Sequence, residues 1–138
     1  MSENNKVPGP CQFESLVELP QDEFDSVFFQ RVLERSSNNI DVLRRQAELL
    51  SRTDRYAEAL ELDQRLARIL PNDQVVHYNL ACSLCLNGQV GSAIVALQTA
   101  IELGYSDFAR IESDPDLDLL RDEPEYVALI DKYADLGF

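Results

Sequence analysis

Residues 74–107 read QVVHYNLACSLCLNGQVGSAIVALQTAIELGYSD, and this stretch decides the fold. Its apolar residues fall at helical spacing on both sides of Asn87-Gly88, a dipeptide that suits a helix end because glycine tolerates positive φ. The preceding 34 residues, 40–73, carry a related pattern. The matching positions are Leu43, Ala47, Leu50, Ala59, Leu60 and Ile69, which recur as His77, Ala81, Leu84, Ala93, Ile94 and Leu103. Such a period predicts a stack of helix-turn-helix units, which forms extended surfaces rather than catalytic pockets.

The rest of the chain extends this stack at both ends. Residues 1–20 contain several proline and asparagine residues, a composition typical of a disordered N-terminal arm. Residues 21–138 are predicted to form a single all-α domain, a right-handed superhelical stack of antiparallel helix pairs. We divide this domain into a half-repeat helix, two full repeats and a group of C-terminal capping helices, at residues 22–37, 40–73, 74–107 and 108–138.

Local signals set the helix boundaries. Asp54 is predicted to be the N-cap of the second helix in the first repeat, because aspartate side chains accept hydrogen bonds from free helix amides. Pro115 and Pro124 are predicted to begin two short helices, since proline fits the first helical turn. These last helices combine an apolar face with many carboxylates, which is typical of a cap that closes the open end of a stack.

Charge is distributed unevenly along the chain. The formal net charge of −13 argues against binding to nucleic acid or anionic lipid, because both ligands need a basic face. Residues 31–68 contain 8 bases and 7 acids, whereas residues 101–138 contain 3 bases and 11 acids. The sequence contains neither a membrane-length apolar stretch nor a basic-then-apolar signal sequence at its start. We therefore expect an acidic, cytoplasmic protein.

Residues 40–107 resemble two copies of the tetratricopeptide repeat, a helix pair with large, small and aromatic residues at fixed places. The residues that match its pattern are Leu43, Ala47, Leu50, Ala59 and Pro71 in the first copy, and Leu80, Ala81, Leu84, Ala93, Leu97 and Ala100 in the second. The tail from Ser113 to Tyr126 also resembles the segment that closes many bacterial arrays of this repeat. The resemblance implies a superhelix that binds protein segments in its concave groove.

Some positions depart from the repeat pattern, and others are strictly constrained by it. Gln46 and Asp63 stand where the family has apolar residues, and Tyr105 replaces the closing proline. The small residues Ala81 and Ala93 are needed because the two helices of a pair approach too closely there for a branched side chain. We expect large residues to be damaging at these two alanines.

Three patterns that could indicate catalysis or metal binding have simpler interpretations. Cys82 and Cys85 form a CxxC in mid-helix, away from the helix N-terminus that would lower a thiol pKa. The acid run that begins at Asp114 partly matches a calcium-binding EF-hand loop, but Leu119 occupies the place of its required glycine. The single histidine, His77, has no accompanying nucleophile signature. We expect no enzymatic activity, no cofactor and no metal site.

The predicted function is that of a non-enzymatic scaffold whose groove binds a peptide or protein segment. In the family, groove-facing residues lie one and two places after the opening residue of each repeat and then at four-residue steps. The resemblance therefore selects Arg44, Arg45, Glu48 and Arg52 in the first copy, and Tyr78, Asn79, Cys82 and Cys85 in the second. Three arginines on one helical face favour a ligand that carries carboxylates. A solvated face with intrachain ion pairs is an equally weighted alternative.

One other function competes with this one. In this alternative, self-association, the acidic C-terminal segment would dock on the arginine-bearing face of another copy, and such head-to-tail contacts can form rings or filaments. Recognition of a chaperone C-terminus is not expected, because the two-carboxylate clamp that some relatives use would be incomplete. Arg44 and Asn79 match that clamp, but Glu48, Ala109 and Ser113 depart from it. The expected partner is therefore an unidentified protein or peptide, which the sequence does not name.

Overall fold

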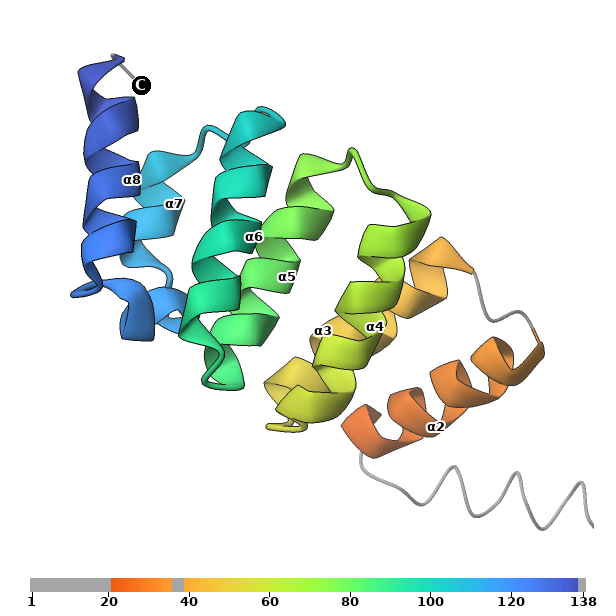
Figure 1. Cartoon of the computed structure of the whole chain (residues 1–138). Coiled ribbons are helices and arrows are strands. Elements are labelled where there is room, and N and C mark those ends of the chain that lie inside the picture. The colour runs from red at the N-terminus through yellow and green to blue at the C-terminus, as the bar shows by residue number, and fades with distance from the viewer. Residues whose placement is uncertain (1–20, 36–38, 137–138) are drawn as a thin grey trace, which may run out of the picture.

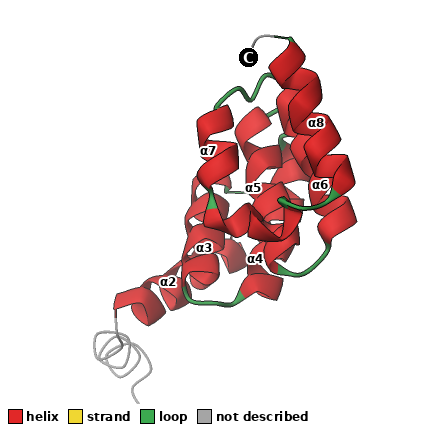
Figure 2. Ribbon diagram, turned by 90° about the vertical axis from the view of Figure 1, so that its left-hand side faces the viewer, coloured by secondary structure: helices red, strands yellow, loops and turns green. Residues whose placement is uncertain are grey.

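The computed structural model describes residues 21–35 and 39–136, and these contain eight helices and no strand. In chain order they are α2 (Gln21–Arg35), α3 (Ile40–Arg52), α4 (Tyr56–Ile69), α5 (Gln74–Leu86), α6 (Val90–Glu102), α7 (Phe108–Ser113), the 3₁₀ helix η2 (Pro115–Leu120) and α8 (Pro124–Asp135). The helices follow one another from α2 at one end to α8 at the other (Figure 1). The turned view places α3, α5 and α7 in one layer and α4, α6 and α8 in a second layer (Figure 2). The predicted all-α stack of helix pairs is confirmed.

Parts of the predicted N-terminal region fall outside this description. The predicted arm at residues 1–20 lies wholly outside the described residues, as do residues 36–38, which include the end of the predicted helix 22–37. The described part of that helix is α2, which packs against α3. None of the helices in residues 21–35 and 39–136 is long and apolar enough to cross a membrane.

Short polar side chains cap the N-termini of α3 and α5. At the start of α3, Asn39 Oδ1 accepts a hydrogen bond from the Val42 amide at 3.2 Å. At the start of α5, Asp73 Oδ1 accepts from the Val75 and Val76 amides at 2.9 and 3.1 Å. These amides have no partner within their own helix, so the caps stabilise the first turn and fix where each helix begins.

The prediction that Asp54 is an N-cap is wrong. The N-cap residue of α4 is Arg55, and no side chain caps this end of the helix. Asp54 has a φ of 64° and its carboxylate accepts a 2.9 Å hydrogen bond from the Tyr56 hydroxyl. The tight connection between α3 and α4 uses a left-handed residue, and aspartate tolerates that conformation better than most residues. Pro115 and Pro124 begin η2 and α8 as predicted.

Closely packed apolar residues form the core between the two layers. The larger cluster runs from Leu60 of α4 through α5 and α6 into the C-terminal helices, and a smaller one joins Leu43, Leu66 and Val76. Ala81 of α5 and Ala93 of α6 are both 0 % exposed. Their methyl groups leave no space for larger side chains between the two helices, because protein interiors are packed about as densely as organic crystals.

The two polar residues at apolar repeat positions are buried and bonded to neighbouring helices. Gln46 Nε2 donates to Ser26 Oγ at 3.0 Å, which joins α3 to α2. Ser83 Oγ donates to Asp63 Oδ2, which joins α5 to α4. Asp63 is only 7 % exposed, and this burial raises the pKa of its carboxyl to about 6 despite the opposing effect of the Ser83 hydrogen bond. Polar pairs thus replace apolar contacts at two helix interfaces.

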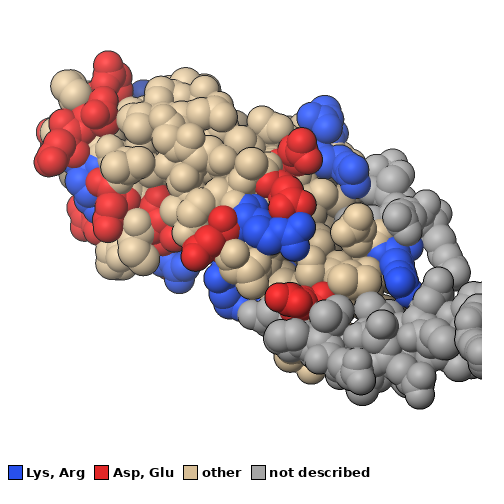
Figure 3. All heavy atoms as spheres, turned by 90° about the horizontal axis from the view of Figure 1, so that it is seen from below, with Lys and Arg blue, Asp and Glu red and all other residues tan. Residues whose placement is uncertain are grey.

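Surface charge follows the uneven distribution along the sequence. On the face in Figure 3, acidic side chains gather toward the end of the molecule that carries α8. Most basic side chains on that face lie toward the middle and the opposite end. The stack is therefore electrically polar along its length.

Ala93→Leu should destabilise the fold by about 1–3 kcal/mol, because a larger side chain at a fully buried helix contact forces its neighbours out of their packed positions. Ala81→Leu should act in the same way. Urea unfolding measures the loss. Gln98→Leu, on the exposed side of α6, is the control and should change the free energy of unfolding by less than about 0.5 kcal/mol. An Ala93→Leu protein as stable as wild type would contradict the close helix contact.

Asp63→Asn should make the protein more stable above pH 7 while changing little below pH 4. The folded pKa of about 6 lies above the ordinary value of 3.8, so the folded state binds this proton more tightly than the unfolded state. The stabilisation is complete below the unfolded pKa and is lost as the pH rises through the folded pKa. That loss amounts to up to about 3 kcal/mol, and asparagine avoids it while still accepting the Ser83 hydrogen bond.

Unfolding free energies of wild type and Asp63→Asn, measured in parallel across this pH range, test the prediction. The difference between the two proteins isolates this group from the other carboxyls that titrate in the same range. A difference that stays constant from pH 4 to pH 8 would show that Asp63 does not carry an unfavourable buried charge.

Candidate functional site

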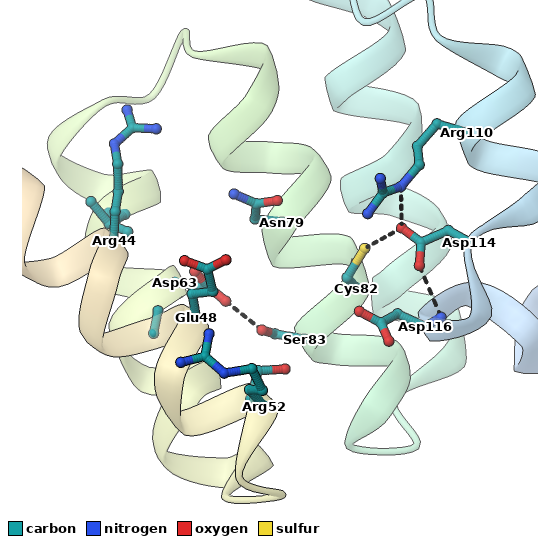
Figure 4. A pocket seen from close by; sticks show the side chains of 13 residues that line it. Arg44, Glu48, Arg52, Asp63, Asn79, Cys82, Ser83, Arg110, Asp114 and Asp116 are labelled. Atoms are coloured by element: carbon teal, nitrogen blue, oxygen red, sulfur yellow. Dashed lines mark hydrogen bonds and ion pairs between the residues drawn. The ribbon is translucent and has the colours of Figure 1, made fainter. Parts of the chain in front are cut away.

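A groove of about 500 Å³ opens in the layer formed by α3, α5 and α7. Helix α3 forms one wall, the segment from Arg110 to Asp116 forms the opposite wall, and α5 with part of α4 forms the floor (Figure 4). The lining residues are Arg44, Ala47, Glu48, Ser51, Arg52, Asp63, Leu66, Asn79, Cys82, Ser83, Arg110, Asp114 and Asp116. The groove is therefore strongly polar and built from five helical segments.

Helical spacing places the wall and floor residues on common faces. Arg44, Glu48 and Arg52 are four residues apart on α3, and Asn79 and Ser83 have the same spacing on α5. Residues at this spacing lie one above the other along a helix. The α3 and α5 faces are held toward the groove because the opposite faces of both helices carry the apolar core residues.

The structure brings together five of the residues that were predicted from the sequence, namely Arg44, Glu48, Arg52, Asn79 and Cys82. Arg45 is exposed but does not line the groove. Tyr78 and Cys85 are buried, at 4 % and 1 % exposure. Each successive residue of a helix is rotated by about 100°, so Tyr78, one place before Asn79, faces the packed interior instead.

Asp114 is buried in the far wall and is held by four hydrogen bonds. Its Oδ2 atom accepts from the Tyr78 hydroxyl at 2.6 Å, from Arg110 Nε at 3.1 Å and from Cys82 Sγ at 3.9 Å. Its Oδ1 atom accepts from the Asp116 amide at 3.0 Å. Burial alone would raise the pKa of Asp114, but the hydrogen bonds from Tyr78, Asp116 and Arg110 outweigh it and lower the pKa below its usual value. Asp114 is therefore a structural carboxylate that joins α5, α7 and η2.

Arg121 stabilises the same wall by hydrogen bonds to its backbone carbonyl groups. Its guanidinium donates to the carbonyl oxygens of Ile111 at 2.6 Å and Asp114 at 2.7 Å, and to the Tyr126 hydroxyl at 3.1 Å. These carbonyls lie near the C-terminal end of α7, where helix carbonyls lack partners within the helix. Tyr105 adds to this support by stacking on Tyr78, with ring centroids 4.3 Å apart. The segment from Arg110 to Asp116 is thus a fixed wall.

Two of the three arginines that line the groove form ion pairs with carboxylates of the chain itself. Arg44 Nη2 lies 3.3 Å from Asp73 Oδ2, and Arg110 Nε lies 3.1 Å from Asp114 Oδ2. Figure 4 shows the Arg44 guanidinium extended away from Asp63 and Asn79. Arg52 is the third base of the lining. The predicted arginine face is therefore divided, since Arg45 lies outside the groove and Arg44 is paired with a carboxylate of the chain itself.

Three carboxylates of the lining have no cationic partner among the described residues. Asp63 has a single hydrogen bond from the Ser83 hydroxyl. Asp116 is half-buried, and this burial together with the nearby Asp114 charge raises the pKa of its carboxyl. Glu48 is exposed at the groove wall. The groove thus combines partnered arginines with unpartnered acids.

The thiols of Cys82 and Cys85 are both buried and free, with no disulfide between them. Burial and the Asp114 charge raise the pKa of Cys82, and burial also raises the pKa of Cys85. A protonated thiol is a poor nucleophile and a poor metal ligand. Cys82, Asp114 and Asp116 place one donor atom each within 4.8 Å of one another, but Tyr78 and Arg110 occupy the Asp114 carboxylate. Of this trio, only the Asp116 carboxylate has no hydrogen-bond or ionic partner among the described residues.

Sequence reasoning missed eight lining residues, including the five whose charges and hydrogen bonds are described above: Asp63, Ser83, Arg110, Asp114 and Asp116. One signal was present, because Asp63 stands at an apolar position of the repeat, and a buried acid needs a polar neighbour such as Ser83. The other three belong to the capping segment. Their place in the groove depends on how η2 packs against α5, which no local pattern in the sequence indicates.

Comparisons by sequence and by structure relate the chain to known proteins. No protein-family model matches the chain. The chain is similar to a chloroplastic protein of Arabidopsis thaliana, with 36% identity over 86 residues that cover 60% of this chain and 26% of that protein. The chain thus spans about a quarter of that relative's length. The relative's name places it in the chloroplast, and the cytoplasmic location expected here stays a prediction.

Among solved structures, the chain is similar to MamA, residues 41 to the end, from Desulfovibrio magneticus RS-1. The TM-score is 0.60 at 18% identity, with 88% of this chain and 72% of that chain covered. A likeness at this identity shows the fold alone. The chain is an all-α stack of helix pairs of the tetratricopeptide-like type.

Proposed function

We propose that the protein is a non-enzymatic interaction scaffold that binds a segment of another protein in the groove between α3 and the Arg110–Asp116 wall. The observation that carries the proposal is the groove itself, a concave, polar surface on a rigid helical stack. Stacked helix pairs commonly use their concave surfaces to bind extended segments. Asn79 lies on the floor of the groove, is exposed, and has no hydrogen-bond partner among the described residues.

The lining suits a peptide better than a small metabolite. Small-molecule sites are mostly apolar and enclosed, with few polar groups. Here most of the lining residues are charged or polar. An extended peptide presents backbone amides and carbonyls along its length, and a side-chain amide such as that of Asn79 can both donate to them and accept from them. The protonated, buried thiols of Cys82 and Cys85 supply no activated nucleophile that would favour an enzyme.

A ligand carboxylate, as predicted from the sequence, would bind on the α3 wall. Arg44 would receive it there by exchanging its partner Asp73, an ion pair in which both side chains are about one-third exposed. Exposed pairs of this kind contribute only about 0–1 kcal/mol, so the exchange is feasible. The self-association alternative also stays a prediction.

Asn79→Arg should abolish or strongly weaken peptide binding, because a long side chain on the groove floor would fill the space that a ligand needs. Peptides are first selected from a random phage-displayed library on the full chain. Their affinities for wild type and variant are then measured by fluorescence anisotropy. Asn79→Arg should weaken groove-binding peptides by at least about tenfold. Asn79 is exposed, so the variant should keep the wild-type helical circular dichroism and melting temperature.

Arg45→Glu is the matched control, because Arg45 is an exposed α3 residue that does not line the groove. It should leave the affinities within about twofold of wild type, since charges outside an interface contribute little. Peptides that bind Asn79→Arg as tightly as wild type would show that the groove is not the binding surface.

A carboxylate-bearing peptide from the same selection should bind Arg44→Gln about three- to tenfold less tightly than wild type, because the variant keeps a hydrogen-bond donor but loses the charge. Peptides without acidic residues serve as the comparison and should be unaffected. Equal losses for both kinds of peptide would contradict a role for Arg44 in binding a carboxylate.

A further inference from the structure

The groove contains a buried carboxylate whose charge nothing in the described chain compensates. Asp63 is 7 % exposed, and its hydrogen bond with Ser83 is made by Oδ2. The Oδ1 atom has no partner among the described residues, yet it is not among their fully buried, unsatisfied atoms. Asp63 lines the groove, so a ligand bound there would lie beside this carboxylate. Buried charges in proteins are normally paired, so this one lacks a partner that a ligand could supply.

The other charged residues that line the groove also leave a negative charge without a partner. The lining contains four carboxylates, those of Glu48, Asp63, Asp114 and Asp116, against three arginines. Arg110 and Tyr78 satisfy Asp114, and Arg44 is bonded to Asp73, outside the lining. Neither Glu48 on the near wall nor Asp116 on the far wall is paired with a cation of the described chain. The unsatisfied charge of the groove is therefore negative, although the sequence by itself favours an acidic ligand.

Building on the proposed function, we propose that the bound segment carries a lysine or arginine whose cationic group enters the groove beside Asp63, between Glu48 and Asp116. The ligand cation supplies the charge partner that Asp63 lacks. A partly buried charge pair of this kind contributes more to affinity than an exposed one, because the surrounding protein screens it less than water does. The carboxylate of the same segment, if present, would lie toward Arg44, so the groove would also fix the direction of the peptide.

A competing explanation is that Asp63 and Ser83 serve only the contact between α4 and α5. That explanation predicts no preference for basic residues in the ligand. It also predicts that removing the Asp63 charge leaves peptide affinity unchanged. Asp63→Asn separates the two, because it keeps the hydrogen bond from Ser83 while removing the charge, and the variant is expected to be at least as stable as wild type above pH 7.

The test uses the phage-selected peptides and the full chain in a double-mutant cycle. Selected peptides that Asn79→Arg excludes should share a lysine or arginine at one position. Replacing that residue with norleucine should weaken binding to wild type by at least about tenfold. On Asp63→Asn, the basic peptide and its norleucine counterpart should bind alike. Asp118→Asn removes an exposed acid of η2 outside the lining and should behave like wild type.

The outcomes distinguish a failure of the basic-ligand inference from a failure of the interaction-scaffold proposal. A tenfold preference that disappears only in Asp63→Asn supports the inference. Groove-binding peptides that share no basic position, or a norleucine penalty that persists in Asp63→Asn, would overturn it and leave the interaction scaffold standing. Selected peptides that all ignore Asn79→Arg would overturn both.

Discussion

The buried Asp114 carboxylate is the interaction on which the groove depends. It accepts hydrogen bonds from Tyr78 of α5, Arg110 of α7 and the backbone of η2, so three elements meet at one side chain. Arg121 holds the carbonyls behind it. Ile111, Leu117 and Leu120 pack the same segments into the apolar core, and the Asp114 hydrogen bonds fix how the far wall faces α3. The network therefore both closes the stack and creates its concave surface.

Two polar residues at apolar repeat positions join neighbouring helices, and one of them, Asp63, adds a buried negative charge to the groove. Gln46 joins α3 to α2 through Ser26, and Asp63 joins α4 to α5 through Ser83. An apolar pair would pack these helices at least as well, because burying a charge is costly. The cost of keeping Asp63 is an unpartnered carboxylate at the groove floor. Under the proposed function, a cation of the ligand would offset this cost and so contribute to the choice of partner.

The sequence predicted the stack well and the groove only in part. The 34-residue period and the small residues at Ala81 and Ala93 were sufficient for the helix pairs, because close helix packing leaves few alternatives at such positions. Arg44, Glu48 and Arg52, which the family resemblance selected, all line the groove, and their role in binding stays a prediction. The far wall could not be predicted, because Arg110 and Asp116 reach the groove through the packing of η2 on α5. The prediction for Asp54 failed because its local pattern fits a cap and a left-handed turn equally well.

The most direct measurement of the central claim is site-specific photo-crosslinking in cells that naturally contain this protein. A small alkyl-diazirine amino acid at position 79 lies on the groove floor without filling it as an arginine would, and the same group at position 98 lies on the exposed side of α6, in the other helix layer. The account predicts a discrete protein adduct at position 79 that is absent at position 98, with the crosslinked peptide containing a basic residue near the site of attachment. Adducts of equal yield at both positions, or a discrete adduct at position 98 alone, would contradict it.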